Sequence, residues 1–279
     1  ANFNLGIRIE LSSSNNITSN TISTSGSASN NGIHLIHSSL SNNINSNTIS
    51  IYGGDSSTFY FEEFLSFYPS DNSLINNTIL NFTGYQLFFN TASINGTYLI
   101  DQPISNYSFT GTGGIVNFKD TTYGEIRFLQ AINGSGTNLS NDVRILNNSA
   151  AVNSSSNSGL NRSANITLYN MPGNFVNPVM LRDGKFCGSR CYNFTNLNTP
   201  SVIFNVSYWT NYSVGEGVTS CSVLNVSNKE YTQVARITPT TSPCINITAQ
   251  NVTFNGNGFD IVNTLLPEEL LILMLIIQL

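Results

Sequence analysis

Two stretches of this chain repeat one phrase, which reads GIRIELSSSNNITSNTIS at residues 6–23 and GIHLIHSSLSNNINSNTIS at residues 32–50. A weaker third copy, SLINNTIL, occupies residues 73–80. Equivalent positions lie about 26–30 residues apart, a period typical of repeat proteins. Each repeat is too small to bury a hydrophobic face alone, so we expect successive repeats to stack on one another.

Within each copy, apolar residues alternate with polar ones, as in Ile7 and Ile9 or Ile33 and Leu35. Alternation with a period of two is typical of β-strands. Asn and Ser separate the short strands, where turns favour residues that hydrogen-bond locally. The pattern predicts one coil of a right-handed parallel β-helix per copy, with Ile22 stacked on the equivalent residue Ile49 of the next coil. It also predicts ladders of hydrogen-bonded Asn side chains at the turns.

The composition is unusual for a soluble protein. Only 9% of the residues are charged, against about 25% in ordinary domains. The net charge is -5 and the isoelectric point about 4.9, which disfavours nucleic acid as a partner because such binding needs a basic surface. The polarity comes instead from Asn, Ser and Thr.

Sequons for N-glycosylation are frequent, and the chain contains 17 of them. An Asn-rich chain produces sequons by chance, but together they favour an extracellular, glycosylated surface. The candidate glycosylation sites are Asn16, Asn76, Asn81, Asn95, Asn106, Asn133, Asn147, Asn165, Asn205 and Asn251.

Four cysteines permit three disulfide pairings. We predict the local pairing, Cys187 with Cys191 and Cys221 with Cys244. A zinc site made by all four is the alternative, although its usual C-x2-C spacing occurs in neither pair. Disulfides indicate an oxidising, exported location.

Four segments differ in their patterns. Residues 1–110 carry the β-helix repeats, and short strands with uneven Gly, Asn and Pro turns over 111–216 predict a β-sandwich of the immunoglobulin type. Residues 217–262 resume the alternation of β-strands, which agrees with the opening coils of a second β-helix. Residues 263–279 form a hydrophobic tail, predicted as a short helix because Pro267 and two glutamates favour a helix start. The tail's apolar run is shorter than a membrane span needs, so we interpret the tail as a truncated transmembrane helix in contact with a membrane, a buried capping helix or a contact surface.

Several motifs after residue 160 resemble predicted archaeal cell-surface proteins, in which a β-sandwich module adjoins right-handed parallel β-helix repeats. The matching residues are SANITLY at 163–169, RDG at 182–184 with the two cysteines that follow, and FNV at 204–206. The phrase NITAQNVTFNGNGF at 246–259 is similar to the first coils of the β-helix in the same proteins. The resemblance implies a surface location and no particular activity.

No catalytic motif accompanies these features. His34 and His37 are the only histidines, and three residues apart on one strand they would take opposite faces. The acidic pair Glu62 and Glu63 is interpreted as a solvated edge. We therefore expect no catalytic residues, no metal site and no cofactor, although residues 255–260 have some features of a calcium loop.

We accordingly expect an extracellular structural or adhesive surface protein without enzymatic activity. Its expected partners are surface polysaccharide, neighbouring modules of a longer chain, or a second copy joined head to tail into a filament. In the filament, residues 245–261 of one copy would stack on 6–23 of the next, with 265–279 buried at the joint. The alternatives are a β-helix carbohydrate-active enzyme, either a lyase or a glycosidase, and a membrane-anchored carbohydrate-binding module. Sugar binding would use aromatic residues such as Tyr52, Tyr60, Tyr68 and Trp209.

Overall fold

The fold is all-β in a computed structural model that describes residues 3–54, 56–63, 68–90 and 95–262. Strands account for 51% of these described residues and helical segments for 4%. The chain divides into two compact units, Ala1–Gly173 with Ser189–Ser213, and Asn174–Gly188 with Val214–Leu279.

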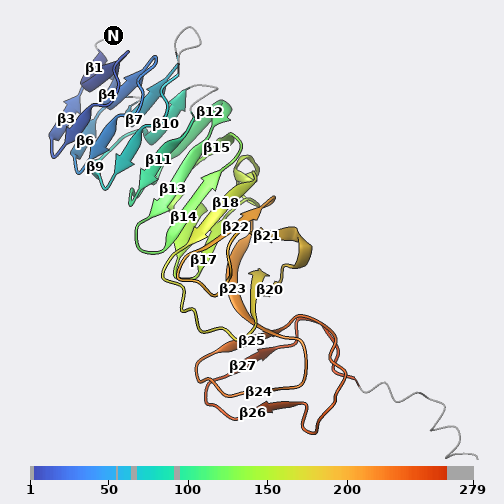
Figure 1. Ribbon diagram of the computed structural model, residues 1–279. Coiled ribbons are helices and arrows are strands. Elements are labelled where there is room, and N and C mark those ends of the chain that lie inside the picture. The colour runs from blue at the N-terminus through green and yellow to red at the C-terminus, as the bar shows by residue number, and fades with distance from the viewer. Residues whose placement is uncertain (1–2, 55, 64–67, 91–94, 263–279) are drawn as a thin grey trace, which may run out of the picture. The chain divides into compact units, whose positions relative to one another are not determined.

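The first unit begins as a β-solenoid whose coils each contribute one strand to two or three parallel sheets (Figure 1). Sheet 1 contains β1 (Phe3–Glu10), β4 (Ala28–Ile36), β7 (Ser57–Glu62), β10 (Tyr85–Asn90) and β12 (Tyr107–Gly114). Sheet 2 contains β2 (Asn16–Thr18), β5 (Asn43–Asn45), β8 (Ser73–Ile75), β11 (Thr97–Ile100) and β13 (Val116–Asp120). Sheet 3 contains β3 (Thr21–Ser25), β6 (Thr48–Tyr52) and β9 (Thr78–Asn81). The predicted β-helix is thus confirmed as a solenoid of stacked parallel strands.

The solenoid core is built from equivalent positions of successive coils. Ile22 pairs with Ile49, which in turn pairs with Ile79. Ile22 and Ile49 are both buried, so the predicted stack is confirmed. In sheet 1, Ile33 and Leu35 are completely buried, and the residue between them, His34, lines a groove on the other face of the strand. Period-two alternation therefore places one face of each strand in the core and leaves the side chains of the other face available for binding.

Two ladders of Asn side chains run along the turns of the solenoid, as predicted. The Nδ2 of Asn15 donates to Oδ1 of Asn42, and Asn42 donates in the same way to Asn72. A second ladder joins Asn20, Asn47, Asn77 and Gln102. Burying an amide costs little free energy when its donor and acceptor both form hydrogen bonds. In these ladders the same hydrogen bonds repeat from coil to coil.

The residue before each ladder amide has a positive φ, which lets the chain turn sharply into the next strand. These residues are Ser14, Ser19, Ser41, Ser46, Asp71, Asn76 and Asp101. Apart from glycine, Asn and Asp tolerate this conformation best because of their short polar side chains.

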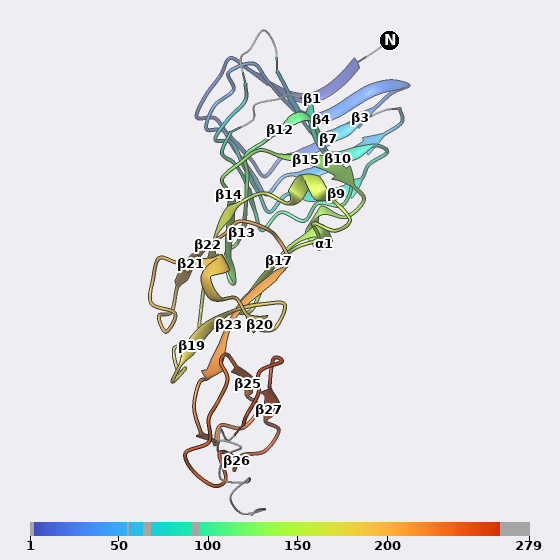
Figure 2. The same cartoon turned by 90° about the vertical axis from the view of Figure 1, so that its right-hand side faces the viewer.

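The remainder of the first unit is largely antiparallel. Sheet 2 continues through β14 (Gly124–Phe128), β18 (Ala164–Leu168), β22 (Val202–Val206) and β21 (Cys191–Asn193), and β15 (Ile132–Gly136) pairs with β12. The other elements are α1 (Leu139–Asp142), β16 (Val143–Leu146), β17 (Ser149–Val152), η1 (Ser158–Leu160) and the start of β23 (Asn211–Val218). Figure 2 shows β14 and β22 following the coils of the solenoid, and β18 pairs with both of these strands.

The second unit is smaller and again contains parallel pairs. Its elements are β19 (Pro178–Arg182), β20 (Lys185–Phe186), the end of β23, β24 (Ser222–Leu224), β25 (Glu230–Gln233), β26 (Ile245–Ile247) and β27 (Thr253–Asn255), and η2 (Gly188–Arg190) begins at its boundary. β24 pairs with β26, and β25 pairs with both β23 and β27, all in parallel. Val218, Leu224, Tyr231 and Ile237 form its main buried cluster.

Two predictions extend beyond these observations. The helix predicted in residues 263–279 lies outside the described residues, and the sandwich over 111–216 stays a prediction. No helix among the described residues is long and apolar enough to cross a membrane.

Candidate functional site

A groove of about 480 Å³ lies on the outward face of sheet 1. It follows one row of the parallel ladder, in which Arg8, His34, Tyr60 and Phe88 are in register on four successive strands. We call it the sheet-1 groove. Its lining residues are Leu5, Arg8, Asn31, His34, Ser56, Ser57, Tyr60, Glu62, Gly84, Tyr85 and Phe88.

Aromatic rings form a continuous stack along this row. The rings of Tyr60 and Phe88 lie 5.3 Å apart with an angle of 10° between their planes, and Phe88 stacks on Tyr85 at 5.2 Å and 17°. On the other side of Tyr60, the ring of His34 lies at 4.7 Å. Tyr85 remains 38% exposed at the end of the stack. The stack stabilises neighbouring coils, and its exposed edge offers an apolar platform beside polar groups.

His34 is a buried polar group of the groove, with an exposed fraction of 7%. Its Nε2 lies 3.0 Å from Oε2 of Glu62, which extends from the next coil. Burial lowers the pKa of His34, while the nearby Glu62 carboxylate works in the opposite direction. An ionised carboxylate only accepts hydrogen bonds, so Nε2 carries the proton and Nδ1 of the neutral ring is an acceptor. This Nδ1 is buried and has no hydrogen-bond partner among the described residues.

Charged groups of the first two coils border the groove. Arg8 forms an ion pair with Glu10 at 3.1 Å. Nδ1 of His37 lies 3.0 Å from Oε1 of the same Glu10. Glu10 and Glu62 are in register with Ile36 between them, so two carboxylates occupy one row of the sheet.

Tyr60 contributes a hydroxyl that accepts a hydrogen bond from Nδ2 of Asn90 at 3.0 Å. Burial raises the pKa of Tyr60, so its phenol is neutral at physiological pH. The groove therefore combines ring surfaces, neutral hydrogen-bonding groups and the Glu62 carboxylate, a set suited to a ligand with apolar faces and hydroxyl edges.

The structure corrects the interpretation of the histidines and of the acidic pair. Strand β4 ends at Ile36, and His37 follows with a positive φ of 58°, so strand alternation does not relate it to His34. Each histidine reaches a glutamate of a different coil. Glu62 is accordingly the hydrogen-bond partner of a buried histidine and not simply part of a solvated edge.

The aromatic residues suggested for sugar binding differ in their position and exposure. Tyr60 lies in the groove, whereas Trp209 is only 2% exposed and packs against Phe128 and Tyr212. Trp209 is thus a core residue and not a sugar platform. Tyr52 is 48% exposed on β6, away from the groove-lining residues.

Sequence analysis missed most of this site, although the repeat period contains the necessary signal. Residues 8, 34 and 60 are spaced by 26, as are residues 10, 36 and 62. A search for charged, polar and aromatic residues at this spacing would have placed Arg8, His34 and Tyr60 in one row of the sheet. The same search would have placed Glu10 and Glu62, two periods apart, in another row.

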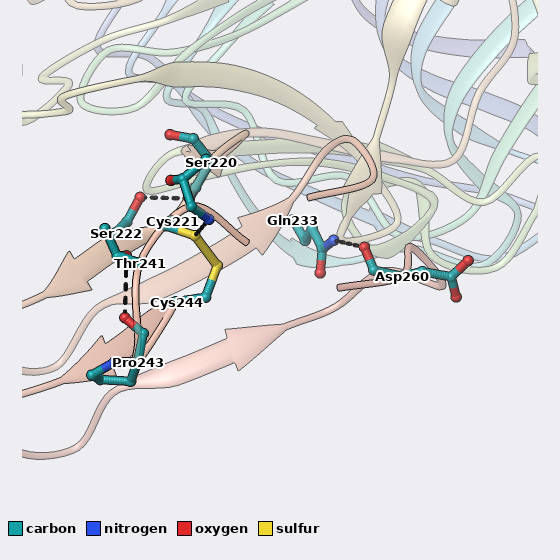
Figure 3. The surroundings of a disulfide bond; sticks show 9 residues. Ser220, Cys221, Ser222, Gln233, Thr241, Pro243, Cys244 and Asp260 are labelled. Atoms are coloured by element: carbon teal, nitrogen blue, oxygen red, sulfur yellow. Dashed lines mark hydrogen bonds between the residues drawn. A yellow bond between two sulfur atoms is a disulfide. The ribbon is translucent and has the colours of Figure 1, made fainter. Parts of the chain in front are cut away.

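Both predicted disulfides are confirmed, Cys187–Cys191 and Cys221–Cys244. The second has a Cα–Cα distance of 4.5 Å and joins residues beside β24 and β26 (Figure 3). In the described part of the chain no cysteine is free, and no group of three His, Cys, Asp or Glu side chains is arranged to hold a metal.

The predicted glycosylation sites vary in exposure. Asn16, Asn76, Asn81, Asn95, Asn147 and Asn251 are exposed. Asn106, Asn133, Asn165 and Asn205 are half-buried, and Nδ2 of Asn205 donates to Oδ1 of Asn165 on the neighbouring strand. The first six are the more accessible acceptors.

No protein-family model, curated protein or solved structure matches this chain. The functional argument therefore depends on the geometry of the groove itself.

Proposed function

We propose that the protein is an extracellular adhesive scaffold that binds carbohydrate in the sheet-1 groove and does not act as an enzyme. The observation that carries this proposal is the stack of Tyr60, Phe88 and Tyr85 beside the His34–Glu62 pair. Sugar rings have apolar C–H faces and hydroxyl edges. Aromatic surfaces bury the faces, and a few fixed polar groups orient the hydroxyls.

The extracellular part of the proposal is supported by chemistry outside the groove. Two disulfides favour an oxidising compartment, and the exposed sequons are suited to glycosylation. The resemblance to archaeal surface proteins agrees with this location. On the same resemblance we also propose a β-sandwich over residues 111–216 and a second β-helix that begins in residues 217–262.

Head-to-tail assembly, or attachment to a neighbouring module, also belongs to the proposal. A further coil stacked on β1–β3 would continue the Asn ladders by donating to Oδ1 of Asn15 and Asn20, as Asn15 itself donates to Asn42. Deletion of residues 265–279 tests the filament directly. Under that proposal the deletion abolishes polymers seen by electron microscopy, and polymers of unchanged length would contradict it.

Polysaccharide binding by variants of two tyrosines tests the main proposal. Tyr85→Ala should weaken retention on an immobilised polysaccharide about tenfold, because aromatic contacts at a binding site typically contribute more than about 1 kcal/mol. Tyr52→Ala is the matched control, since Tyr52 is at least as exposed but lies outside the groove. Equal losses in the two variants, or no retention of the unchanged protein by any polysaccharide in the panel, would refute the proposal.

A glycosidase is the second candidate, and the register of Glu10 and Glu62 favours it. Parallel strands lie about 4.8 Å apart, so carboxylates two strands apart approach the separation of about 6.5–9.5 Å used by inverting glycosidases. Release of reducing sugar from a bound polysaccharide, abolished by Glu10→Gln, would establish this activity. Binding without any release of sugar would leave the adhesive function.

A further inference from the structure

The strongest unexplained group in the sheet-1 groove is Nδ1 of His34. The side chain is nine-tenths buried, lines the groove, and uses its other nitrogen to bond Glu62. Nδ1 itself is buried without a partner among the described residues. A buried acceptor left unpaired loses its hydration and gains nothing in exchange. Because Nδ1 is buried while the His34 side chain lines the groove, a hydroxyl that enters the groove reaches Nδ1 when a neighbouring lining side chain shifts.

We propose that His34 Nδ1 accepts a hydrogen bond from a hydroxyl group of a neutral carbohydrate, with Glu62 holding the ring in the tautomer that makes this possible. This inference rests on the proposed function and adds the class of ligand and the residue that selects it. A hydroxyl is the appropriate partner because it donates a proton to Nδ1 and leaves the ring uncharged.

The charges around His34 disfavour an acidic ligand. Glu62 on β7 lines the groove, and the lining cation Arg8 is already paired with Glu10 on β1. Tyr60 on β7 packs against the ring and is neutral, and His37 follows on the same chain segment as His34. A uronate chain would bring carboxylates toward Glu62, while Glu10 already neutralises the guanidinium of Arg8, so repulsion should reduce its affinity.

Acidification should abolish binding. When His34 becomes protonated, Nδ1 carries a hydrogen and can no longer accept from the ligand. Burial lowers the pKa of His34 from 6.5, so the neutral form predominates at pH 7 and binding is lost only as pH falls below 6.5. Glu62 favours the protonated ring and Arg8 disfavours it. Glu62→Gln should therefore shift the midpoint of the binding profile to lower pH, and Arg8→Gln should shift it to higher pH.

The experiment measures retention of the intact protein on immobilised dextran, xylan and mannan, with polygalacturonate as the acidic probe, from about pH 7.5 to about pH 4.5. We expect binding to at least one neutral polysaccharide, weaker binding to polygalacturonate, and a loss of at least about tenfold at the acidic end. Circular dichroism at each pH confirms that the fold persists.

Two substitutions of His34 separate its two nitrogens. His34→Asn places an amide oxygen near the position of Nδ1, so it should retain binding within a few-fold and lose the pH dependence. His34→Gln places its amide nitrogen near the position of Nε2, so it can still donate to Glu62 but lacks the acceptor. We expect this variant to lose at least about tenfold in binding. Matching melting temperatures show that both variants are folded.

The outcomes distinguish the two proposals. Retention that is independent of pH, or equal in His34→Gln and the unchanged protein, overturns the role of His34 and leaves carbohydrate binding standing. Absence of retention on all four polysaccharides at every pH overturns both. Nitrogen NMR of the ligand-free protein provides a further check, because the proposal requires a neutral ring at pH 7 with its proton on Nε2. A proton on Nδ1 would refute it.

Discussion

The solenoid coils and the second unit use parallel strands in the same way but stabilise them by different means. In the solenoid, apolar stacks and Asn ladders recur in each coil, so every coil supports its neighbours. The second unit has a small buried cluster and adds Cys221–Cys244 and a buried ion pair between Glu216 and Lys229 at 2.7 Å. The solenoid is thus stabilised by the repetition of its coils, whereas the shorter second unit relies on a disulfide and an ion pair.

The buried ion pair of the second unit is completed by neutral donors and rings. The Glu216 carboxylate accepts a hydrogen bond from the backbone N–H of Val176 at 2.9 Å and another from that of Asn177. Nζ of Lys229 lies 5.5 Å from the ring centre of Tyr231 and 5.3 Å from that of Phe175. A buried carboxylate with this many partners is costly to disturb on one side only.

The largest effect is expected from a charge in the solenoid core. Ile49→Asp should lower the free energy of unfolding by about 4 kcal/mol, because it buries a carboxylate without a partner between two coils. Ser50→Asp on the same strand is the control, since Ser50 is only half-buried. Chemical denaturation measures both, and an unchanged midpoint for Ile49→Asp would show that the register of β3, β6 and β9 is different.

Breaking the ion pair of the second unit should cost slightly less. Lys229→Met leaves the Glu216 carboxylate buried without its cation and should destabilise by about 3 kcal/mol. The double variant Glu216→Gln with Lys229→Met removes both charges and should recover part of this loss. If the double variant is as unstable as the sum of the two single variants, the pair is not coupled.

The disulfide of the second unit gives a comparable effect by another mechanism. Replacing Cys221 and Cys244 by Ser opens a loop of 23 residues, which in the chain-entropy model removes about 3 kcal/mol. The control is the Cys187–Cys191 pair, whose much shorter loop predicts a smaller loss. Calorimetry measures the loss of stability in both variants. A larger loss on removing Cys187–Cys191 would contradict the prediction.

The smallest effect is expected from one position of the Asn ladder. Asn47→Ala removes the amide that accepts from Nδ2 of Asn20 and donates to Asn77 Oδ1 and to the Ile17 carbonyl. Losing these partly or fully buried hydrogen bonds should cost about 2 kcal/mol. Asn45→Ala, two residues earlier and only half-buried, should have little effect. Similar losses in the two variants would mean that the ladder adds nothing to ordinary turn formation.

The solenoid could be predicted from sequence because its defining contacts connect equivalent positions of a visible repeat. Ile22 and Ile49, or Asn15 and Asn42, are found simply by adding the period. Phe88 illustrates the limit, since a longer loop places it 28 residues after Tyr60 although the two rings stack. The pairing of His37 with Glu10 was equally inaccessible, because it depends on a positive φ at the end of a strand.

The Asn ladders have a direction that the repeating coils alone do not reveal. Each hydrogen bond between two ladder Asn side chains runs from Nδ2 to an Oδ1 of the following coil, whereas Asn42 and Asn47 give their second Nδ2 hydrogen to a backbone carbonyl of the preceding coil. The side-chain dipoles therefore point the same way along the column and polarise one another. Such a column has an oxygen-rich end and a nitrogen-rich end, so two identical ends have no complementary hydrogen bonds to offer. Any coil that extends it must be joined with the same polarity.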